Sequence, residues 1–361
     1  MAEGQDDRTI VVVGGYGAVG RVAALMLSAW FPGRVVVAGR DLGRAAEFAR
    51  STRGAVTARR IDVERAADVA DMLEGASVVV MCVERANEAV ARACLERGVH
   101  YIDVSASATV LAAIARLHPV AVRHGATAAL SVGLAPGLTN LLARHCVDRL
   151  PTATHVDITV LVGLGEHHGA GAVEWTVGNL AAPAGRGGAH TAKRARVRLP
   201  EFGPRTAYPF PFSDQYTLTE TLGLPVRTRL CFDSKVMTGT VFALRRAGLF
   251  ALMRRLRLHT ALTALFSRFH MGTDRYVVQA TAYDRDGRRE TCAASGRLEA
   301  RATAIVTAHV ARRLRHGTAP PGVLHLDQLL NPVPFFAELA EGEITFHGAA
   351  AGAGAARGHR E

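Results

Sequence analysis

The sequence predicts a two-domain α/β protein, with an N-terminal doubly wound parallel sheet followed by a second α/β domain whose sheet is mostly antiparallel. A β-branched run, Thr9–Val13, leads directly into a glycine-rich loop. Strand and helix patterns then alternate as far as Pro151. Beyond that residue, strands with period-two patterning appear, such as Thr154–Val162, so we expect a domain boundary near Pro151.

The first half of the chain reads as six strands separated by helices. Strands buried on both faces of a parallel sheet are short apolar runs, and the helices between them carry apolar residues three and four apart. The expected strands are Thr9–Val13, Arg34–Ala38, Ala55–Ile61, Ser77–Val83, His100–Val104 and Thr127–Val132. The expected helices are Val19–Trp30, Leu42–Ser51, Ala66–Leu73, Ala86–Arg97 and Ala108–His118.

The second half is patterned less regularly. The expected strands are Thr154–Val162, Arg227–Asp233, Tyr276–Tyr283 and Glu290–Ala294, and Ala300–Leu314 is an expected helix. The segment Ala181–Pro211 is rich in Gly, Pro and Arg, which predicts a surface loop. Leu244–Phe269 reads as one or two helices with leucines on one side and arginines on the other. That pattern fits a solvated face over a core stripe, or a helix resting on an anionic membrane.

The composition bounds the possible partners. The 361 residues carry a net charge of +11, and Lys193 and Lys235 are the only lysines among the basic residues. This arginine bias fits either a GC-rich genome or a basic surface. No dense Lys/Arg run with interleaved aromatic residues occurs, so we expect no nucleic-acid partner.

The cysteines and the N-terminus indicate the cellular setting. The five cysteines are scattered and form no C-x-x-C pair, which argues against zinc, any other metal centre and a disulfide framework. The stretch Ala2–Thr9 is polar and acidic, unlike a secretion signal. No apolar run is long enough to span a bilayer. We therefore expect a cytoplasmic protein without an integral membrane segment.

The glycine loop Gly15-Tyr16-Gly17-Ala18-Val19-Gly20 has the spacing G-x-G-x-x-G between a strand and a helix. In this context Gly15 permits the tight turn, Gly17 lets the backbone approach a pyrophosphate, and Gly20 allows close helix packing. The free N–H groups and the helix dipole would face the phosphates. The loop predicts a Rossmann dinucleotide site, the alternative being a structural turn without a ligand.

The end of the second strand bears on which dinucleotide binds. An NAD enzyme usually has an acidic residue there to hold the ribose 2′-hydroxyl, whereas this chain has Gly39-Arg40-Asp41. A guanidinium can grip a 2′-phosphate, and a carboxylate would repel it. We therefore predict NADP(H), with Arg44 assisting, although Asp41 weakens the case and Arg40 could be an ordinary surface arginine.

Further cofactor contacts are expected where the next strands end. Asp62 and Val63 follow the third strand, where such folds contact the adenine. Cys82 and Val83 end the fourth strand, beside the expected nicotinamide ribose, and Ser105 follows the fifth. Cys82 can equally be a small apolar core residue, because nothing nearby in the sequence would activate it.

Four segments carry residues that are typical of one known family: Gly15–Gly20, Ala38–Arg40, Cys94–Ser105 and Gly133–Asn140. Together they resemble the saccharopine dehydrogenase-like family. Pro321–Val323 with Gln328 and Pro334–Phe336 look like that family's closing segment, which returns to the Rossmann domain. The resemblance covers most of the chain and is strongest before Leu142.

The resemblance implies an architecture and a function. We expect a Rossmann domain over residues 1–150, a substrate-binding and dimerisation domain over 151–320, a returning segment over 321–347 and a disordered tail over 348–361. The active site would lie in the cleft between the domains of a homodimer. Characterised members of the family, such as saccharopine reductase and lysine 6-dehydrogenase, move a hydride to or from a carbon bonded to nitrogen. An NADP(H)-dependent oxidoreductase acting on an amino-acid-derived imine or amine is therefore expected.

The loop around Pro136 and Gly137 is the expected substrate contact. Saccharopine-forming relatives carry an acidic residue just before this Pro-Gly pair, whereas this chain has Ala135, so saccharopine itself is not the expected substrate. The loop leads into a helix start that includes Asn140 and could hold a substrate carboxylate. Its other interpretation is a plain turn and helix cap.

Imine reduction needs a proton donor near the substrate nitrogen. The candidates are His167 and His168, which follow a predicted strand, and Asp103 at the end of the fifth strand. Glu174 could bind a substrate amine and Trp175 could form a pocket wall. Each of these residues can instead be structural.

Two other functions stay open at this stage. The family also includes lipid-acting enoyl reductases, for which the basic helix within Leu244–Phe269 would dock on a membrane or a carrier protein. Because no residue is unmistakably catalytic, a redox-inactive dinucleotide sensor or scaffold is the third possibility.

Overall fold

A computed structural model describes residues 7–166, 170–181, 193–255, 272–317, 319–341 and 343–348. The chain divides into two compact units. The first comprises Met1–Gly133 and Thr303–Leu329, and the second comprises Leu134–Ala302 and Leu330–Glu361. Each unit is built around one sheet.

The first unit contains a seven-stranded parallel sheet with the strand order β13-β6-β5-β4-β1-β2-β3. Its strands are β1 (Thr9–Val13), β2 (Val35–Gly39), β3 (Thr57–Arg60), β4 (Ala76–Met81), β5 (His100–Asp103), β6 (Thr127–Leu130) and β13 (Gly322–His325). Its helices are α1 (Ala18–Trp30), α2 (Leu42–Ser51), α3 (Ala66–Leu73), α4 (Asn87–Glu96), α5 (Ala108–Ala115), α6 (His118–Arg123) and α14 (Leu326–Leu329). Helix α13 (Glu299–Arg315) crosses the division between the units.

The strand order reverses beside β1, because β2 and β3 lie on one side of it and β4 on the other. In open α/β sheets this switch point is where ligands bind, outside the carboxyl ends of the strands. The glycine loop follows β1, and Cys82 follows β4, so both predicted cofactor segments leave the sheet at this point.

Both faces of this sheet are buried, as the β-branched runs predict. Val11, Val13, Val79 and Met81 pack in one apolar cluster with residues of α3, α4, α5 and α6. Side chains at alternate strand positions point to the opposite face, and Ile10, Val12, Val78 and Val80 are also fully buried there.

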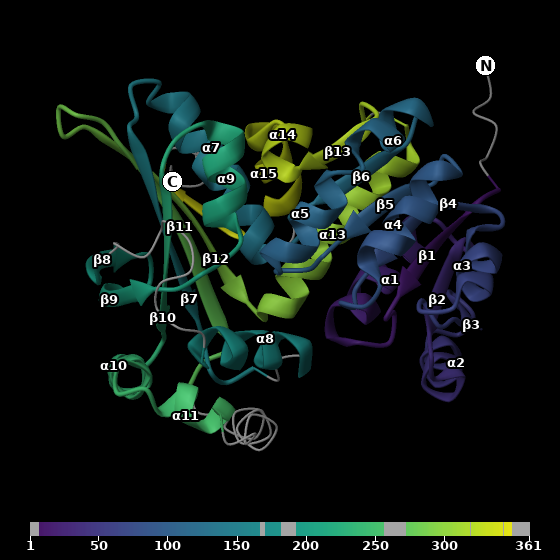
Figure 1. The fold of residues 1–361 in the computed structure, drawn as a ribbon, viewed down its shortest axis with the longest axis horizontal. Helices are drawn as coiled ribbons and strands as arrows, with labels where there is room; N and C mark the ends of the chain where they lie inside the picture. Colours follow the sequence, from purple (N-terminus) through teal and green to yellow (C-terminus); the bar gives the residue numbers. More distant parts are fainter. Residues whose placement is uncertain are drawn as a thin grey trace, which may run out of the picture. The chain divides into compact units, whose positions relative to one another are not determined.

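The C-terminal segment returns to the first unit, as the family resemblance implies. Strand β13 pairs in parallel with β6, with Val323 opposite Ala128, and Figure 1 shows the two strands side by side. The imidazole of His118 packs against Gly322, whose φ is +141°. The backbone N–H of Val323 donates to Nδ1 of the same ring at 3.2 Å.

The second unit contains a seven-stranded mixed sheet with the order β14-β12-β11-β7-β10-β9-β8. Strands β7 and β10 are parallel, whereas the other neighbouring pairs are antiparallel. The strands are β7 (His155–Val162), β8 (Ala195–Leu199), β9 (Gly203–Pro209), β10 (Val226–Phe232), β11 (Arg275–Tyr283), β12 (Arg289–Arg297) and β14 (Thr345–Gly348). The helices are α7 (Thr139–Arg149), α8 (Ala170–Ala181), α9 (Asp214–Leu222), α10 (Lys235–Arg246), α11 (Leu249–Arg255) and α15 (Pro332–Ala340).

Several details differ from the sequence-based expectations. Within Ala181–Pro211, predicted to be a loop, residues 195–209 form the β8–β9 hairpin. The first unit ends at Gly133 rather than at residue 150, because α7 packs on β11 and β12 of the second sheet. The return of the chain to the first unit spans 303–329 rather than 321–347, and residues from 330 onward belong to the second unit.

The predicted basic helix is described only in part. It begins earlier than expected, at Lys235, and is interrupted between Arg246 and Leu249. The described portion ends at Arg255, and most of the predicted tail, residues 349–361, also lies outside the described residues. In the part of the chain that is described, no helix has the length and apolar character needed to cross a membrane.

Candidate functional site

The glycine loop closes tightly between β1, β2 and α1. A Cβ atom added to Gly15 would lie 2.7 Å from the Cβ of Val37, and one added to Gly20 would lie 2.4 Å from the carbonyl oxygen of Gly14. A larger side chain at Gly15 would collide with β2, and one at Gly20 would push α1 away from the loop. The loop therefore needs glycine at both positions, as the G-x-G-x-x-G pattern predicts.

The start of α1 is open to an anion. Gly17 is the N-cap residue and provides no side-chain cap, and the first turn has no acidic residue. Gly17 and Ala18 are exposed, and Val19 is half-buried. The first N–H groups of a helix have no partner within the helix and lie at the positive end of its dipole, so this terminus suits a phosphate.

Tyr16 links the glycine loop to the end of β2. Its ring lies against Gly39, where an added Cβ would be 2.5 Å from Cε1 of the tyrosine. The backbone N–H of Asp41 donates to the Tyr16 hydroxyl at 3.4 Å. The guanidinium of Arg44 lies over the same ring, 4.9 Å from its centroid. The predicted cofactor residues of β1 and β2 are thus brought together.

Arg40 and Asp41, the two charged residues that follow β2, have different surroundings. Asp41 is the N-cap of α2, and its Oδ1 accepts a hydrogen bond from the N–H of Arg44 at 3.0 Å. Arg40 is exposed and has neither a hydrogen bond nor an ion pair within the described part of the chain. The carboxylate serves the helix, whereas the guanidinium remains available.

The segment after β3 is held by its own turn. Asp62 Oδ1 accepts from the N–H of Glu64 at 3.2 Å, and the N–H of Asp62 donates to Asp68 at 2.9 Å. Val63 is buried in the apolar cluster of the first unit. Neither Asp62 nor Val63 contacts the glycine loop through an observed hydrogen bond.

The segment after β4 lies against the glycine loop. A Cβ added to Gly14 would be 2.7 Å from Cγ1 of Val83 and 3.3 Å from the carbonyl oxygen of Cys82. Gly14, which adopts a φ of +74°, is a loop residue outside the predicted motif. Burial raises the pKa of Cys82 to about 12, with Asp103 adding to the rise, so the thiol stays protonated. This favours the interpretation of Cys82 as a small packing residue.

Asp103 is fully buried and has three hydrogen-bond donors. They are the Tyr101 hydroxyl at 2.6 Å, the Asn87 side-chain amide at 2.9 Å and the Ser105 N–H at 2.7 Å. Burial raises the pKa of this carboxyl, although the three hydrogen bonds act in the opposite direction. Tyr101 and Asn87 were not predicted, but Tyr101 lies two residues before Asp103 and so on the same side of β5.

Ser105 continues this network. Its hydroxyl donates to the Glu84 carboxylate at 2.9 Å and accepts from the N–H of Ser107 at 3.0 Å. The network connects the ends of β4 and β5 with the beginning of α4, and it lies entirely in the first unit. It can fix the backbone beside the glycine loop, which is the side where Cys82 and Val83 lie.

The predicted substrate loop is buried in the second unit. The peptide bond between Ala135 and Pro136 is cis, and Gly137 has a φ of +135°. Asn140 Oδ1 accepts from the N–H of Gly137 at 3.0 Å, and its amide donates to Thr217 at 3.4 Å. Asn140 therefore holds the loop on α7 and α9.

Asp214, at the beginning of α9, is a buried carboxyl that the sequence analysis missed. Its Oδ1 accepts from the Thr228 hydroxyl on β10 at 2.6 Å. Burial raises the pKa of Asp214 to about 6 in spite of this hydrogen bond. No local sequence signal reveals it, because the partner lies on a strand 14 residues later.

The other predicted residues of the second unit are dispersed. Glu174 is exposed, whereas Trp175 is half-buried and packs on Phe210 and Phe212 with ring centroids 5.6 and 5.4 Å away. Glu166 accepts from the N–H groups of Glu299 and Ala300, at the beginning of α13. His167 and His168 lie outside the described residues.

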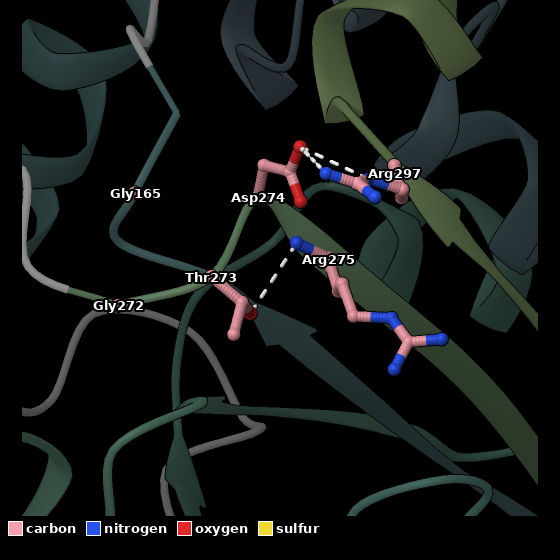
Figure 2. A pocket seen from close by; sticks show the side chains of 6 residues that line it. All are labelled: Gly165, Gly272, Thr273, Asp274, Arg275 and Arg297. Atoms are coloured by element: carbon pink, nitrogen blue, oxygen red, sulfur yellow. Dashed lines mark hydrogen bonds and ion pairs between the residues drawn. The ribbon is translucent and has the colours of Figure 1, made fainter.

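A pocket of about 670 Å³ occurs where β7, β11 and β12 meet in the second unit, lined by Gly165, Gly272, Thr273, Asp274, Arg275 and Arg297 (Figure 2). Arg297 binds Asp274 at 2.9 Å, and Arg275 binds Glu201 at 2.5 Å. Hydrogen bonding by Arg297 lowers the pKa of Asp274. The charges in this pocket are therefore matched within the unit. No cluster of three His, Cys, Asp or Glu residues suited to a metal occurs among the described residues.

Comparison with known proteins identifies the N-terminal domain. Residues 10–129 match the family model of the saccharopine dehydrogenase NADP binding domain. This part of the chain is similar to that domain family. The resemblance predicted from the sequence is confirmed, and so is its coarse functional meaning, an NAD(P)-binding domain of the saccharopine dehydrogenase type.

The fold likeness extends beyond this domain. The apo form of saccharopine dehydrogenase (L-Glu forming) from Saccharomyces cerevisiae matches with a TM-score of 0.67 and 16% identity, covering 94% of this chain and 99% of that one. A probable dehydrogenase from Thermotoga maritima has 10% identity and a TM-score of 0.46, covering 94% of this chain and 98% of that one. No curated protein matches the chain.

Proposed function

We propose that the chain is an NADP(H)-dependent oxidoreductase that transfers a hydride at a C–N bond of an amino-acid-derived substrate. The observation that supports NADP(H) over NAD(H) is the different surroundings of Arg40 and Asp41, the two charged residues that follow β2. The carboxylate of Asp41 is occupied by the α2 cap, while Arg40 is exposed beside the glycine loop. A dianionic 2′-phosphate would meet the exposed guanidinium of Arg40 there, while the Asp41 carboxylate keeps its charge but has one oxygen engaged by the α2 cap.

The residues of the first unit fit a dinucleotide. The uncapped start of α1 would hold the pyrophosphate, and Arg40 and Arg44 would hold the 2′-phosphate. Tyr16, fixed against Gly39, would orient Arg44 through the contact with its ring. When bound, the nicotinamide supplies or accepts the hydride, and the protein supplies position and electrostatics.

We assign Asp103 a positioning role in place of the catalytic one predicted from the sequence. Full burial and three donors leave its carboxyl poorly placed to exchange a proton with a substrate. Through Ser105 and Asn87 it instead fixes the segments that follow β4 and β5. His167 and His168 remain the proposed proton donors, because an imidazole titrates near neutral pH.

The substrate class depends on the family resemblance and on the Pro136–Gly137 loop. The resemblance to the saccharopine dehydrogenase-like family supports an amino-acid-derived imine as substrate, and Ala135 argues against saccharopine itself. Trp175, within its aromatic cluster, is proposed as a pocket wall, and exposed Glu174 as a contact for a substrate amine.

Titration of NADPH and NADH against the purified chain tests the cofactor proposal. Arg40→Asp is expected to weaken NADPH binding by at least tenfold, because it removes a charge-assisted hydrogen bond and adds a repulsive carboxylate. Arg123→Asp is the matched control, since Arg123 is an exposed arginine on α6 and is expected to leave the affinity unchanged. Equal affinities for NADPH and NADH in the unmodified chain would sink the proposal.

A screen for NADPH oxidation with imino acids and with enoyl thioesters tests the reaction class. Turnover with an imino acid supports C–N chemistry, and turnover with only the enoyl compound assigns the chain to the lipid-acting alternative. Tight NADPH binding without turnover of either class favours the redox-inactive sensor. Light scattering on the same sample tests the predicted homodimer.

A further inference from the structure

Helices α10 and α11 expose an unusual number of large apolar side chains. Val236 is 80% exposed, Leu244 38%, Leu249 37% and Leu252 51%. All four lie within one short stretch of the second unit, whereas the other exposed large apolar side chains among the described residues are dispersed. A contiguous apolar patch on a folded surface usually marks an interaction site.

One face of α10 is used for packing. Phe242 stacks on Tyr208 with ring centroids 4.5 Å apart, and Arg245 donates to the carbonyl of Pro209 at 3.1 Å. Val241 and Phe242 are buried, so this side of the helix rests on the β9 side of the sheet. Figure 1 shows α10 and α11 following one another just beyond β10.

The outer face of α10 is apolar. Val236, Thr240 and Leu244 are spaced four residues apart and so lie on one side of the helix. They are all exposed, and the exposed Ala243 and Ala247 fall on the same side. Leu249 and Leu252 are the exposed leucines of the next helix, α11. We call Val236, Leu244, Leu249 and Leu252 the apolar strip.

Positive charge borders the apolar strip. Residues 235–255 include no acidic residue, and Lys235, Arg246 and Arg255 are exposed basic residues of this stretch. Lys235 and Arg246 are three helical turns apart, so they align along one edge of the apolar face, and both are exposed. The partner of this surface must therefore be both apolar and anionic.

A second copy of the chain meets only half of this requirement. Two identical strips brought face to face would place basic edges against each other, and the chain as a whole carries +11. Protein-binding hot spots are also rich in Trp and Tyr, whereas every exposed residue of the strip is aliphatic. An anionic bilayer offers an apolar interior beneath a layer of phosphate groups, which suits both features.

We propose that α10 and α11 form a peripheral membrane-binding surface that rests on an anionic lipid bilayer. The apolar strip enters the boundary between head groups and acyl chains, and Lys235, Arg246 and Arg255 bind lipid phosphates. This inference concerns the second unit and does not depend on the cofactor or the reaction proposed above.

Co-sedimentation of the full chain with vesicles tests the proposal. Binding is expected to vesicles of phosphatidylcholine with phosphatidylglycerol, and much less to phosphatidylcholine alone. Leu244→Asp/Leu252→Asp is expected to abolish binding. Lys235→Gln/Arg246→Gln is expected to weaken it about thirty-fold, the equivalent of about 1 kcal/mol for each basic residue. Added salt should weaken binding of the unmodified chain.

The controls separate the strip from exposed apolar and basic residues in general. Val333→Asp changes a side chain that is 52% exposed on α15, and Arg123→Gln removes a surface charge on α6, so both should sediment like the unmodified chain. Unchanged thermal unfolding shows that each variant is folded. The proposal is overturned if the unmodified chain stays in the supernatant with anionic vesicles, or if the double aspartate variant still pellets. It is also overturned if the double aspartate variant instead converts a dimer into a monomer, because the strip would then belong to a second copy.

Discussion

Arg40 and Asp41, adjacent at the end of β2, show how the surroundings of a residue decide which role it can take. Arg40 and Asp41 carry opposite charges, and in isolation each could meet a ribose or its phosphate. The structure occupies the carboxylate of Asp41 with the N–H of Arg44 and leaves Arg40 exposed. The sequence allowed Arg40 to be singled out because the motif fixes its position relative to the glycine loop. It did not show that the neighbouring acid was already engaged.

Asp214 gives a residue-scale prediction about pH. Its pKa is about 6 in the folded chain, above the ordinary value for an aspartate, because of burial. Between these values the folded state binds more protons than the unfolded state, so the contribution of Asp214 to stability falls as pH rises. Asp214→Asn removes this titration and keeps an acceptor for Thr228. The unmodified chain should therefore lose stability relative to the variant as pH rises, so the difference in free energy of unfolding, variant minus unmodified chain, is expected to increase from about pH 4 to about pH 7.

Urea unfolding at several pH values measures this difference. Asp71→Asn is the control, because Asp71 is an exposed carboxyl on α3. The stability of this control should run parallel to that of the unmodified chain. If Asp214→Asn also runs parallel, Asp214 does not titrate in this range and the prediction is wrong.

At the scale of elements, the sequence was most informative where the pattern was local. The helix limits Leu42–Ser51 and Ala66–Leu73 agree with the structure, because each is a compact apolar pattern between clear breaks. The β8–β9 hairpin was predicted to be a loop, since its exposed positions carry arginines and its ends are rich in Gly and Pro. Strand β9 pairs with the distant strand β10 and β8 pairs with β9, and the pairing with β10 is not revealed by any local pattern.

The cap of α2 provides an element-scale prediction. Asp41→Ala removes the acceptor for the Arg44 N–H, and a lost N-cap typically costs about 1 kcal/mol of stability. The affinity for NADPH is not expected to fall, because the variant keeps Arg40 and removes a negative charge. Thermal unfolding and nucleotide titration, carried out together, separate the two effects. A variant that is as stable as the unmodified chain but binds NADPH weakly would assign Asp41 to the cofactor instead.

For the whole molecule, the sequence predicted two sheets and the return of the chain to the first, but not the exact division between the units. The return was inferred from the family resemblance, and β13 confirms it. The boundary was placed at residue 150 because the strand pattern changes there. The structure places it at Gly133, since α7 covers the second sheet through side chains that meet distant strands. Contacts of this kind depend on the tertiary fold, as does the Asp103 network with Asn87.

The return of β13 gives a prediction for the first unit as a whole. Gly322 has a φ of +141°, and an added Cβ would lie 2.7 Å from Cε1 of His118. Gly322→Ala is expected to destabilise the first unit by about 1–3 kcal/mol through backbone strain and displacement of the imidazole. Thermal unfolding measures this loss of stability. Added NADPH should raise the unfolding temperature of the variant, which starts from a lower value than that of the unmodified chain. Gly178→Ala, on α8 with open space around the added methyl group, is the control and should be no less stable than the unmodified chain, because alanine favours a helix more than glycine does.

The position of β13 late in the chain also delays completion of the first sheet during synthesis. The hydroxyl of Thr127, at the beginning of β6, donates to the carbonyl of Pro320, which is 193 residues later in the chain. At roughly 5–20 residues per second, a ribosome needs roughly 10–40 s to synthesise the intervening segment. During that time β6 is an unpaired edge strand, and such edges readily pair with other chains. The nascent first unit thus waits for its last strand while the second unit is made, and this interval is when a chaperone would protect it most.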